Sequence, residues 1–139
     1  MNNEVFLTIV SGTAIYVLGQ LIQGLIIKPY LEYKEVIGRI DNKLKFYAHL
    51  IRSKMVSDQR VVEVYLELRQ LSCDLESSYK KLLLTSEADK KKVSKAAQSL
   101  IFLSNVTGSK SHNFLVKDYE KIDENEQIVR ENLNIPKLW

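Results

Sequence analysis

The stretch of residues 5–27 constrains this chain more than any other feature. Its 23 residues, VFLTIVSGTAIYVLGQLIQGLII, contain no acidic residue, no basic residue and no proline. A helix of that length extends about 35 Å, which is enough to cross the ~30 Å hydrocarbon layer of a bilayer. Because backbone groups in lipid must find their hydrogen-bond partners within the segment, the stretch is predicted to be a transmembrane helix.

Two other interpretations of this stretch are weaker. The buried core helix of a soluble protein seldom runs this long without a charge. A cleaved signal peptide normally begins with basic residues, whereas residues 1–4 contain none, and no small-x-small cleavage site follows the apolar run. We therefore expect residues 1–4 to form a short extracytoplasmic leader and residues 5–27 to remain as a membrane anchor.

Positive charge is distributed unequally on the two sides of the stretch. The basic residues that follow it are Lys28, Lys34, Arg39, Lys43 and Lys45. The excess predicts that the N terminus lies outside and residues 28–139 lie in the cytoplasm, in a single-pass protein of the inner (cytoplasmic) membrane. Tyr30 and Tyr33 stand where interfacial aromatic residues belong, and Pro29 is expected to end or kink the helix at the boundary.

One face of the predicted transmembrane helix combines small and polar residues. Its members are Gly12, Tyr16, Gly19 and Gln23 at 4-3-4 spacing, with Gln20 and Gly24 beside them. Small residues let two helices approach closely, and glutamine amides can hydrogen-bond across the contact, so this face predicts a homo-oligomer. The alternative is that glycine is common in membrane helices and that glutamines near an interface reach headgroups or water.

Downstream of the anchor, apolar residues recur at the three-to-four-residue spacing of helices. The first stripe, in a helix expected over 31–53, contains Tyr33, Val36, Ile37, Ile40, Leu44, Tyr47, Ala48 and Ile51. The second, in a helix expected from a cap at Ser57 or Asp58 to residue 84, contains Val61, Val64, Tyr65, Leu68, Leu71, Leu75, Tyr79 and Leu82. The short connection between the two predicts an antiparallel hairpin.

Two further helices complete the expected domain. One begins at the N-cap Ser86 and stops at Gly108, and the other covers residues 112–133, with Pro136 excluding continuation. No stretch alternates apolar and polar residues long enough to indicate a sheet. The predicted fold class is all-α, with one N-terminal transmembrane helix followed by a single cytoplasmic domain, an antiparallel bundle of about four helices.

Reaction chemistry is not indicated by any motif. The two histidines, His49 and His112, have no cysteine or second histidine one helical turn away, which argues against a metal site. His49 is expected to be a partly buried structural residue. No nucleophile elbow and no phosphate-binding glycine-rich loop is present, and the single cysteine, Cys73, is expected to be an ordinary thiol in a helix. We therefore predict no enzymatic activity, no cofactor and no metal.

Basic residues gather where the second and third helices of the domain are expected to meet. A nucleic-acid partner is disfavoured because no aromatic residues are interleaved with them and the net charge is only +3. The first two domain helices are nearly equal in length, so their connection is expected to return to the bilayer, and a second pair would return the tail. The residues predicted to contact the membrane surface are Lys28, Lys80, Lys81, Lys90, Lys91, Lys92 and Trp139. Alternatively, the helices tilt sideways and the lysines are merely solvated.

The C-terminal helix is predicted to be mostly solvated and acidic. Its apolar stripe is interrupted by Glu126, and its charges could instead meet a basic partner. Such surface pairs contribute only ~0–1 kcal/mol each.

The overall layout resembles small bacterial single-pass membrane proteins of unassigned function. The features that carry this resemblance are the uncharged span, the proline at its exit and the helical domain behind it. The resemblance implies no active-site residues. The function we expect is a membrane-tethered, non-enzymatic adaptor or scaffold that self-associates and binds a protein partner. The alternatives are a toxin-like effector that oligomerises and perturbs the bilayer, and an auxiliary subunit of a larger membrane complex.

Overall fold

The computed structural model describes residues 3–52, 58–108 and 116–136. These residues form helices and the turns between them, with no strand, so the all-α prediction is confirmed for the described chain. The elements are α1 (Asn3–Ile22), the π-helical segment η1 (Gln23–Ile27), α2 (Lys28–Arg52), α3 (Asp58–Lys80), α4 (Glu87–Gly108) and α5 (Val116–Asn132).

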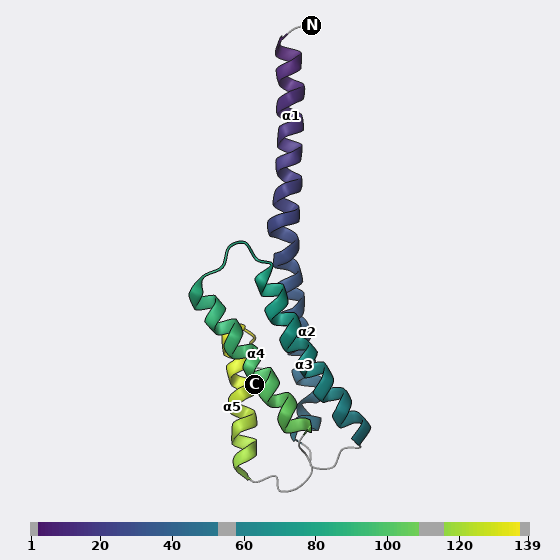
Figure 1. Ribbon diagram of the computed structural model, residues 1–139, viewed down its shortest axis with the longest axis vertical. Helices are drawn as coiled ribbons and strands as arrows, with labels where there is room; N and C mark the ends of the chain where they lie inside the picture. The colour runs from purple at the N-terminus through teal and green to yellow at the C-terminus, as the bar shows by residue number, and fades with distance from the viewer. Residues whose placement is uncertain (1–2, 53–57, 109–115, 137–139) are drawn as a thin grey trace.

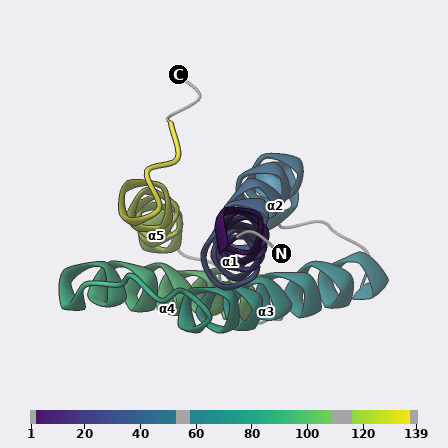
Figure 2. The same cartoon turned by 90° about the horizontal axis from the view of Figure 1, so that it is seen from above.

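Four of these helices form a bundle, and the fifth stands outside it. Figure 1 shows α1 projecting from one end of the molecule, while α2 to α5 run alternately down and up beside one another. Seen from above in Figure 2, α3 and α4 form one layer, and α2 and α5 form the other. The predicted antiparallel helical bundle is therefore present.

The core of the bundle includes the apolar stripes predicted for the first two domain helices, together with residues of α4 and α5. Its fully buried large side chains include Ile40, Leu44 and Ile51 of α2, Val64, Leu68 and Leu75 of α3, Leu100 and Leu103 of α4, and Ile122 and Val129 of α5. Each helix thus turns one apolar face inward.

Helices α3 and α4 pack with their backbones close together. Ser72 donates a hydrogen bond to the Ala97 carbonyl oxygen (2.9 Å), and Ser104 donates one to the Tyr65 carbonyl oxygen (3.0 Å). At Gly108, an added Cβ atom would lie 2.9 Å from the Tyr65 ring. Small residues on α4 therefore allow the close approach, and the two hydroxyls satisfy buried polar groups across the contact.

Pro29 does not end the helix, which was one of the two outcomes expected from the sequence. A single helix runs from Asn3 to Arg52. The turn immediately before the proline is π-helical, and the Lys28 amide donates to the Gln23 carbonyl oxygen five residues back. Proline lacks an amide donor and its ring crowds the carbonyl four residues earlier, so a locally wider turn gives it room without a break.

The second predicted helix ends earlier than expected. Helix α3 stops at Lys80 rather than at residue 84. The hydrogen bonds after Lys80 span three residues instead of four: the Lys81 amide donates to the Ser78 carbonyl oxygen (3.3 Å), and the Leu82 amide donates to that of Tyr79 (3.0 Å). The two leucines that follow, Leu83 and Leu84, consequently lie in the turn rather than in a helix.

The start of α4 agrees with the predicted cap. The Asp89 amide donates to Ser86 Oγ (3.1 Å), and Ser86 Oγ donates to the Asp89 carboxylate (2.7 Å). The hydroxyl thereby satisfies one of the free amides of the first turn, and the acidic residue complements the helix N terminus.

The end of α5 is closed by a Schellman motif. Asn134 adopts a left-handed conformation (φ 53°), and the Ile135 amide donates to the Arg130 carbonyl oxygen (2.8 Å). Buried Ile135 supplies the apolar contact of this motif, and Pro136 follows. His112 and Trp139, like Leu115, lie outside the described residues, as does the expected start of this helix.

Candidate membrane interface

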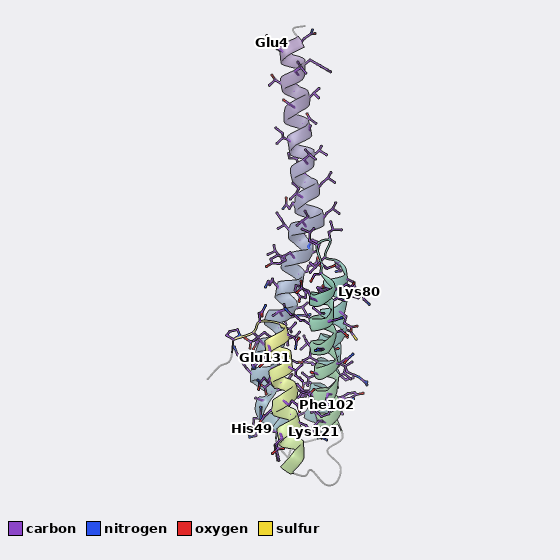
Figure 3. The ribbon with its side chains drawn as sticks, turned by 90° about the vertical axis from the view of Figure 1, so that its left-hand side faces the viewer. Glu4, His49, Lys80, Phe102, Lys121 and Glu131 are labelled. Atoms are coloured by element: carbon purple, nitrogen blue, oxygen red, sulfur yellow. The ribbon has the colours of Figure 1, made fainter. Side chains whose placement is uncertain are left out.

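Helix α1 is exposed on all sides. None of its residues is buried, and Figure 3 shows its side chains, from Glu4 onward, with no other element beside them. The hydroxyl groups bond within the helix, because Thr8 donates to the Glu4 carbonyl oxygen (2.8 Å) and Thr13 to that of Ile9 (2.9 Å). By length and composition this helix could cross a membrane. The core helix of a soluble protein would be mostly buried, whereas the apolar part of this helix is not buried at all.

The predicted association face lies open along α1 and η1. An added Cβ atom at Gly12, Gly19 or Gly24 would meet nothing within 4 Å. Tyr16, Gln20 and Gln23 are also exposed. The backbone is therefore accessible to a second helix here, and association through this face stays a prediction.

The two tyrosines at the helix junction differ in their surroundings. Tyr30 is half exposed, with Lys34 Nζ 5.6 Å from its ring centre. Tyr33 instead packs against Tyr79 of α3, with ring centres 5.7 Å apart. Burial, followed by the proximity of Tyr79 and Asp89, raises the pKa of Tyr33 to about 12. Only Tyr30 retains the exposure expected of an interfacial aromatic residue.

The α3–α4 turn lies beside this junction. Lys81 Nζ is 2.9 Å from the Glu32 carboxylate of α2, and Figure 1 shows the turn level with the base of the projecting helix. A cavity of about 390 Å³ lies between them, with Ile26 and Tyr30 on one wall and Leu84 on another. The connection thus lies beside the end of the apolar stretch, and its return to a bilayer stays a prediction.

The residues predicted to contact a membrane surface gather at the same end. Lys28 directly follows η1, and Figure 3 shows Lys80 near the junction, with His49 and Lys121 towards the opposite end of the bundle. Lys90 lies 3.7 Å from Glu87 and Lys92 lies 3.9 Å from Asp89, so these lysines have acidic neighbours. Lys91 is exposed. Trp139 lies outside the described residues.

An ionic cluster between α2 and α5 was missed by sequence reasoning. The Arg130 side chain, only 8% exposed, contacts Asp41 (3.0 Å) and Glu126 (3.2 Å). Glu126 also contacts Arg52 (2.7 Å), which reaches Asp123 (2.6 Å). Glu126 is therefore not a solvated interruption of the stripe but one partner of two arginines. The available signal was the spacing of Glu126 and Arg130, one helical turn apart on an otherwise apolar face.

A second polar contact joins α2 to α3. Lys43 Nζ lies 2.7 Å from the Glu67 carboxylate, and the Tyr47 hydroxyl donates to the same carboxylate (2.7 Å). The hydrogen bond from Lys43 holds the pKa of Glu67 below its usual value, while burial raises the pKa of Tyr47. Because every group has a partner within the bundle, this contact fixes the packing of two helices.

Metal-binding geometry is absent from the described part of the chain. No group of three or more histidine, cysteine or carboxylate side chains there could hold a metal ion. His49 is exposed, not partly buried as expected, and Cys73 is an exposed free thiol on α3. No protein-family model, curated protein or solved structure matches this chain. Its function is therefore inferred from the arrangement of its own residues.

Proposed function

We propose that this chain is a membrane-tethered, non-enzymatic helical adaptor. In this proposal α1 and η1 cross the inner membrane, and the bundle of α2 to α5 lies in the cytoplasm. The main observation that supports this proposal is the continuous helix Asn3–Arg52. Its first half has no buried side chain, and its second half forms one wall of the bundle. Since no loop interrupts it, the bundle is held at a fixed position relative to the anchor.

The orientation is supported by the charge distribution around the apolar segment. Lysine and arginine follow it closely, starting at Lys28, whereas residues 1–4 carry none. Cytoplasmic loops of membrane proteins are enriched in these residues. This distribution supports the proposal that the N terminus lies outside.

Two exposed surfaces support protein partners. On the outer face of α3, Val62 and Leu66 are one turn apart and more than half exposed, near the end of the bundle remote from α1. These side chains offer an apolar contact for a cytoplasmic partner. On α1, the open backbone at Gly12 and Gly19 would let a second copy approach closely.

Cysteine labelling tests both the anchor and its direction. Cys73 is the only cysteine and is exposed, so a thiol reagent can reach it in the folded protein. A membrane-impermeant maleimide is expected to spare Cys73 in intact cells and to label it after permeabilisation. Labelling in intact cells would reverse the orientation, and release of the protein from membranes by alkaline carbonate would refute the anchor.

Crosslinking in membranes tests self-association. The double variant Gly12→Leu/Gly19→Leu is expected to reduce crosslinked oligomer several-fold, because leucine side chains would separate the two backbones. Val17→Leu, elsewhere on the same helix, serves as the matched control. Equal crosslinking of the unmodified protein, the double variant and the control would show that α1 does not form the interface.

The rival functions give different results. Depolarisation of cells that depends on Gln20 and Gln23 would replace the adaptor with a membrane effector. Stoichiometric co-purification with one integral membrane protein in detergent would indicate an auxiliary subunit. An adaptor is expected to do neither and to lose its cytoplasmic partner when Leu66 is replaced by glutamate.

A further inference from the structure

The α3–α4 turn is held firmly beside the end of the apolar helix. Lys81 bonds to Glu32, and the Tyr79 ring packs on Tyr33, so two contacts join the last turn of α3 to the start of α2. The Tyr79 hydroxyl also donates to the Ser86 carbonyl oxygen (3.2 Å), across the turn. The turn consequently has a defined position relative to η1.

Two consecutive leucines of this turn point away from the core. Leu82 is partly buried against the bundle, whereas Leu83 is 62% exposed and Leu84 is 84% exposed. Among the described residues, Leu84 has the largest exposed fraction of any large hydrophobic side chain, including those of α1. In water these two side chains contribute almost nothing to the stability of the fold, because their apolar surface stays exposed.

The apolar surface of the turn is continuous with that of the predicted anchor. Leu83 and Leu84 line the same cavity as Ile26 of η1 and Tyr30 of α2. Ile26 belongs to the segment long and apolar enough to enter lipid. An apolar environment around Ile26 would therefore lie directly next to Leu84.

Lysines flank the two leucines along the chain, and one of these lysines, Lys92, lines the same cavity together with Asp89. The lysines near the turn are Lys80, Lys81, Lys90, Lys91 and Lys92, while Glu87 and Asp89 are the acidic residues of the first turn of α4. Basic residues next to exposed apolar side chains are the combination that binds the interfacial region of anionic bilayers. The charge pattern thus selects a lipid surface as the occupant.

We propose that the α3–α4 turn is a second lipid contact, in which Leu83 and Leu84 enter the leaflet from which α2 emerges and the lysines lie at its anionic headgroups. This inference rests on the proposed function, since it requires that the apolar helix crosses the bilayer. Two contacts, the helix and the turn, set the orientation of the bundle relative to the membrane. The cavity between them is then filled by lipid.

Tryptophan quenching by brominated lipids tests the contact. Trp139 is the only tryptophan, so the Trp139→Phe variant has no tryptophan fluorescence. Three single tryptophans are then introduced into this variant, one at a time: Leu84→Trp, Leu66→Trp and Ile15→Trp. The full chain is reconstituted in vesicles of phosphatidylcholine with one anionic phospholipid, phosphatidylglycerol. Leu84→Trp is expected to be quenched by bromine near the headgroup end of the acyl chain, Ile15→Trp by bromine deep in the chain, and Leu66→Trp by neither.

The three reporters separate the possible failures. Quenching of Ile15→Trp without quenching of Leu84→Trp beyond the Leu66→Trp level would overturn the second contact and leave the anchor intact. Absence of quenching at Ile15→Trp would overturn the anchor and this inference together. Adding Lys90→Glu and Lys91→Glu is expected to reduce Leu84→Trp quenching at least twofold in the anionic vesicles. An unchanged signal would overturn the role of the lysines.

Discussion

Helix α1 and the bundle use the same apolar residue types in opposite ways. Leu18 of α1 is 58% exposed, whereas Leu68 of α3 is 0% exposed. Helix α1 carries large apolar residues on all sides and has no charged face to turn towards water. The bundle helices carry apolar stripes between charged faces, so each has one side to bury. The distribution of apolar residues around the helix, more than their number, therefore decides which environment a helix can occupy.

Polar groups follow the same division. In α1 the hydroxyls of Thr8 and Thr13 bond to the preceding turn of their own helix. In the bundle some hydroxyls also bond within their own helix, as Thr107 does to Leu103, but others and several charges bridge different helices, as Ser72 does to Ala97 and Arg130 to Asp41. A helix surrounded by lipid must satisfy its polar groups internally, whereas a packed helix can use its neighbours.

Deleting one leucine side chain from each region is expected to give the largest contrast. Leu68→Ala removes fully buried methyl groups and should lower the free energy of unfolding of the bundle by about 2–5 kcal/mol. Leu18→Ala should change it by less than about 0.5 kcal/mol, because no bundle residue contacts that position. Urea unfolding in detergent, followed by circular dichroism, measures both. Similar losses would mean that α1 packs against the bundle.

The ionic cluster provides a second contrast within the bundle. Glu126→Gln removes the charge between Arg52 and Arg130, and the buried Arg130 is left with Asp41 as its acidic partner. We expect a loss of about 1–3 kcal/mol in the free energy of unfolding, measured in the same urea series. Glu120→Gln, at an exposed position of the same helix, is the control. Equal stability of the two variants would show that the cluster contributes nothing.

The sequence predicted those parts of the fold that depend on local periodicity. The stripe through Ile40, Leu44 and Ile51 is buried as expected, because helical spacing alone places these residues on one face. The cap at Ser86 was also predictable, since its partners lie within three residues. Of the two outcomes expected at Pro29, the end of the helix was wrong, because the rule for proline assumes α-helical hydrogen bonding and η1 supplies a wider turn.

The features of the candidate site depend on residues distant in the sequence. Leu83 and Leu84 were expected inside a helix, and nothing local indicated that α3 would end at Lys80. The pairing of Glu126 with Arg52 joins positions 74 residues apart. Such pairs depend on which helices lie side by side. The spacing of apolar residues along one helix does not specify its neighbours. The sequence predicted the group of lysines around the α3–α4 turn but not the two exposed leucines in that turn.

Removing the cap of α4 is expected to have a moderate effect. Ser86→Ala leaves the Asp89 amide without its side-chain acceptor and should cost about 1 kcal/mol in the free energy of unfolding. Ser77→Ala, at an exposed position of α3, should cost nothing measurable. A loss confined to Ser86→Ala would show that the α3–α4 turn is stabilised from within the bundle. Equal stability would mean that the turn is held by its tyrosine and lysine contacts alone.

The smallest expected effect is a change of stability with pH, and it again separates the two regions. Burial raises the pKa of Tyr33 from 10.0 to about 12, so between these values the folded state keeps a proton that the unfolded state has lost. The free energy of unfolding is therefore expected to fall as pH rises from 10 towards 12, and to be unaffected by this group below pH 10. The loss stays below the full value of the shift because Tyr33 is only partly buried and solvent screens its charge. The phenylalanine of Tyr33→Phe cannot ionise, so the urea midpoint of this variant should decline less steeply between pH 10 and 12. A residual decline is expected from Tyr47 and Tyr79, because burial raises their pKa values as well. Tyr16→Phe, in α1, should leave the decline unchanged, and a reduced decline in that variant would show that α1 and the bundle are energetically linked.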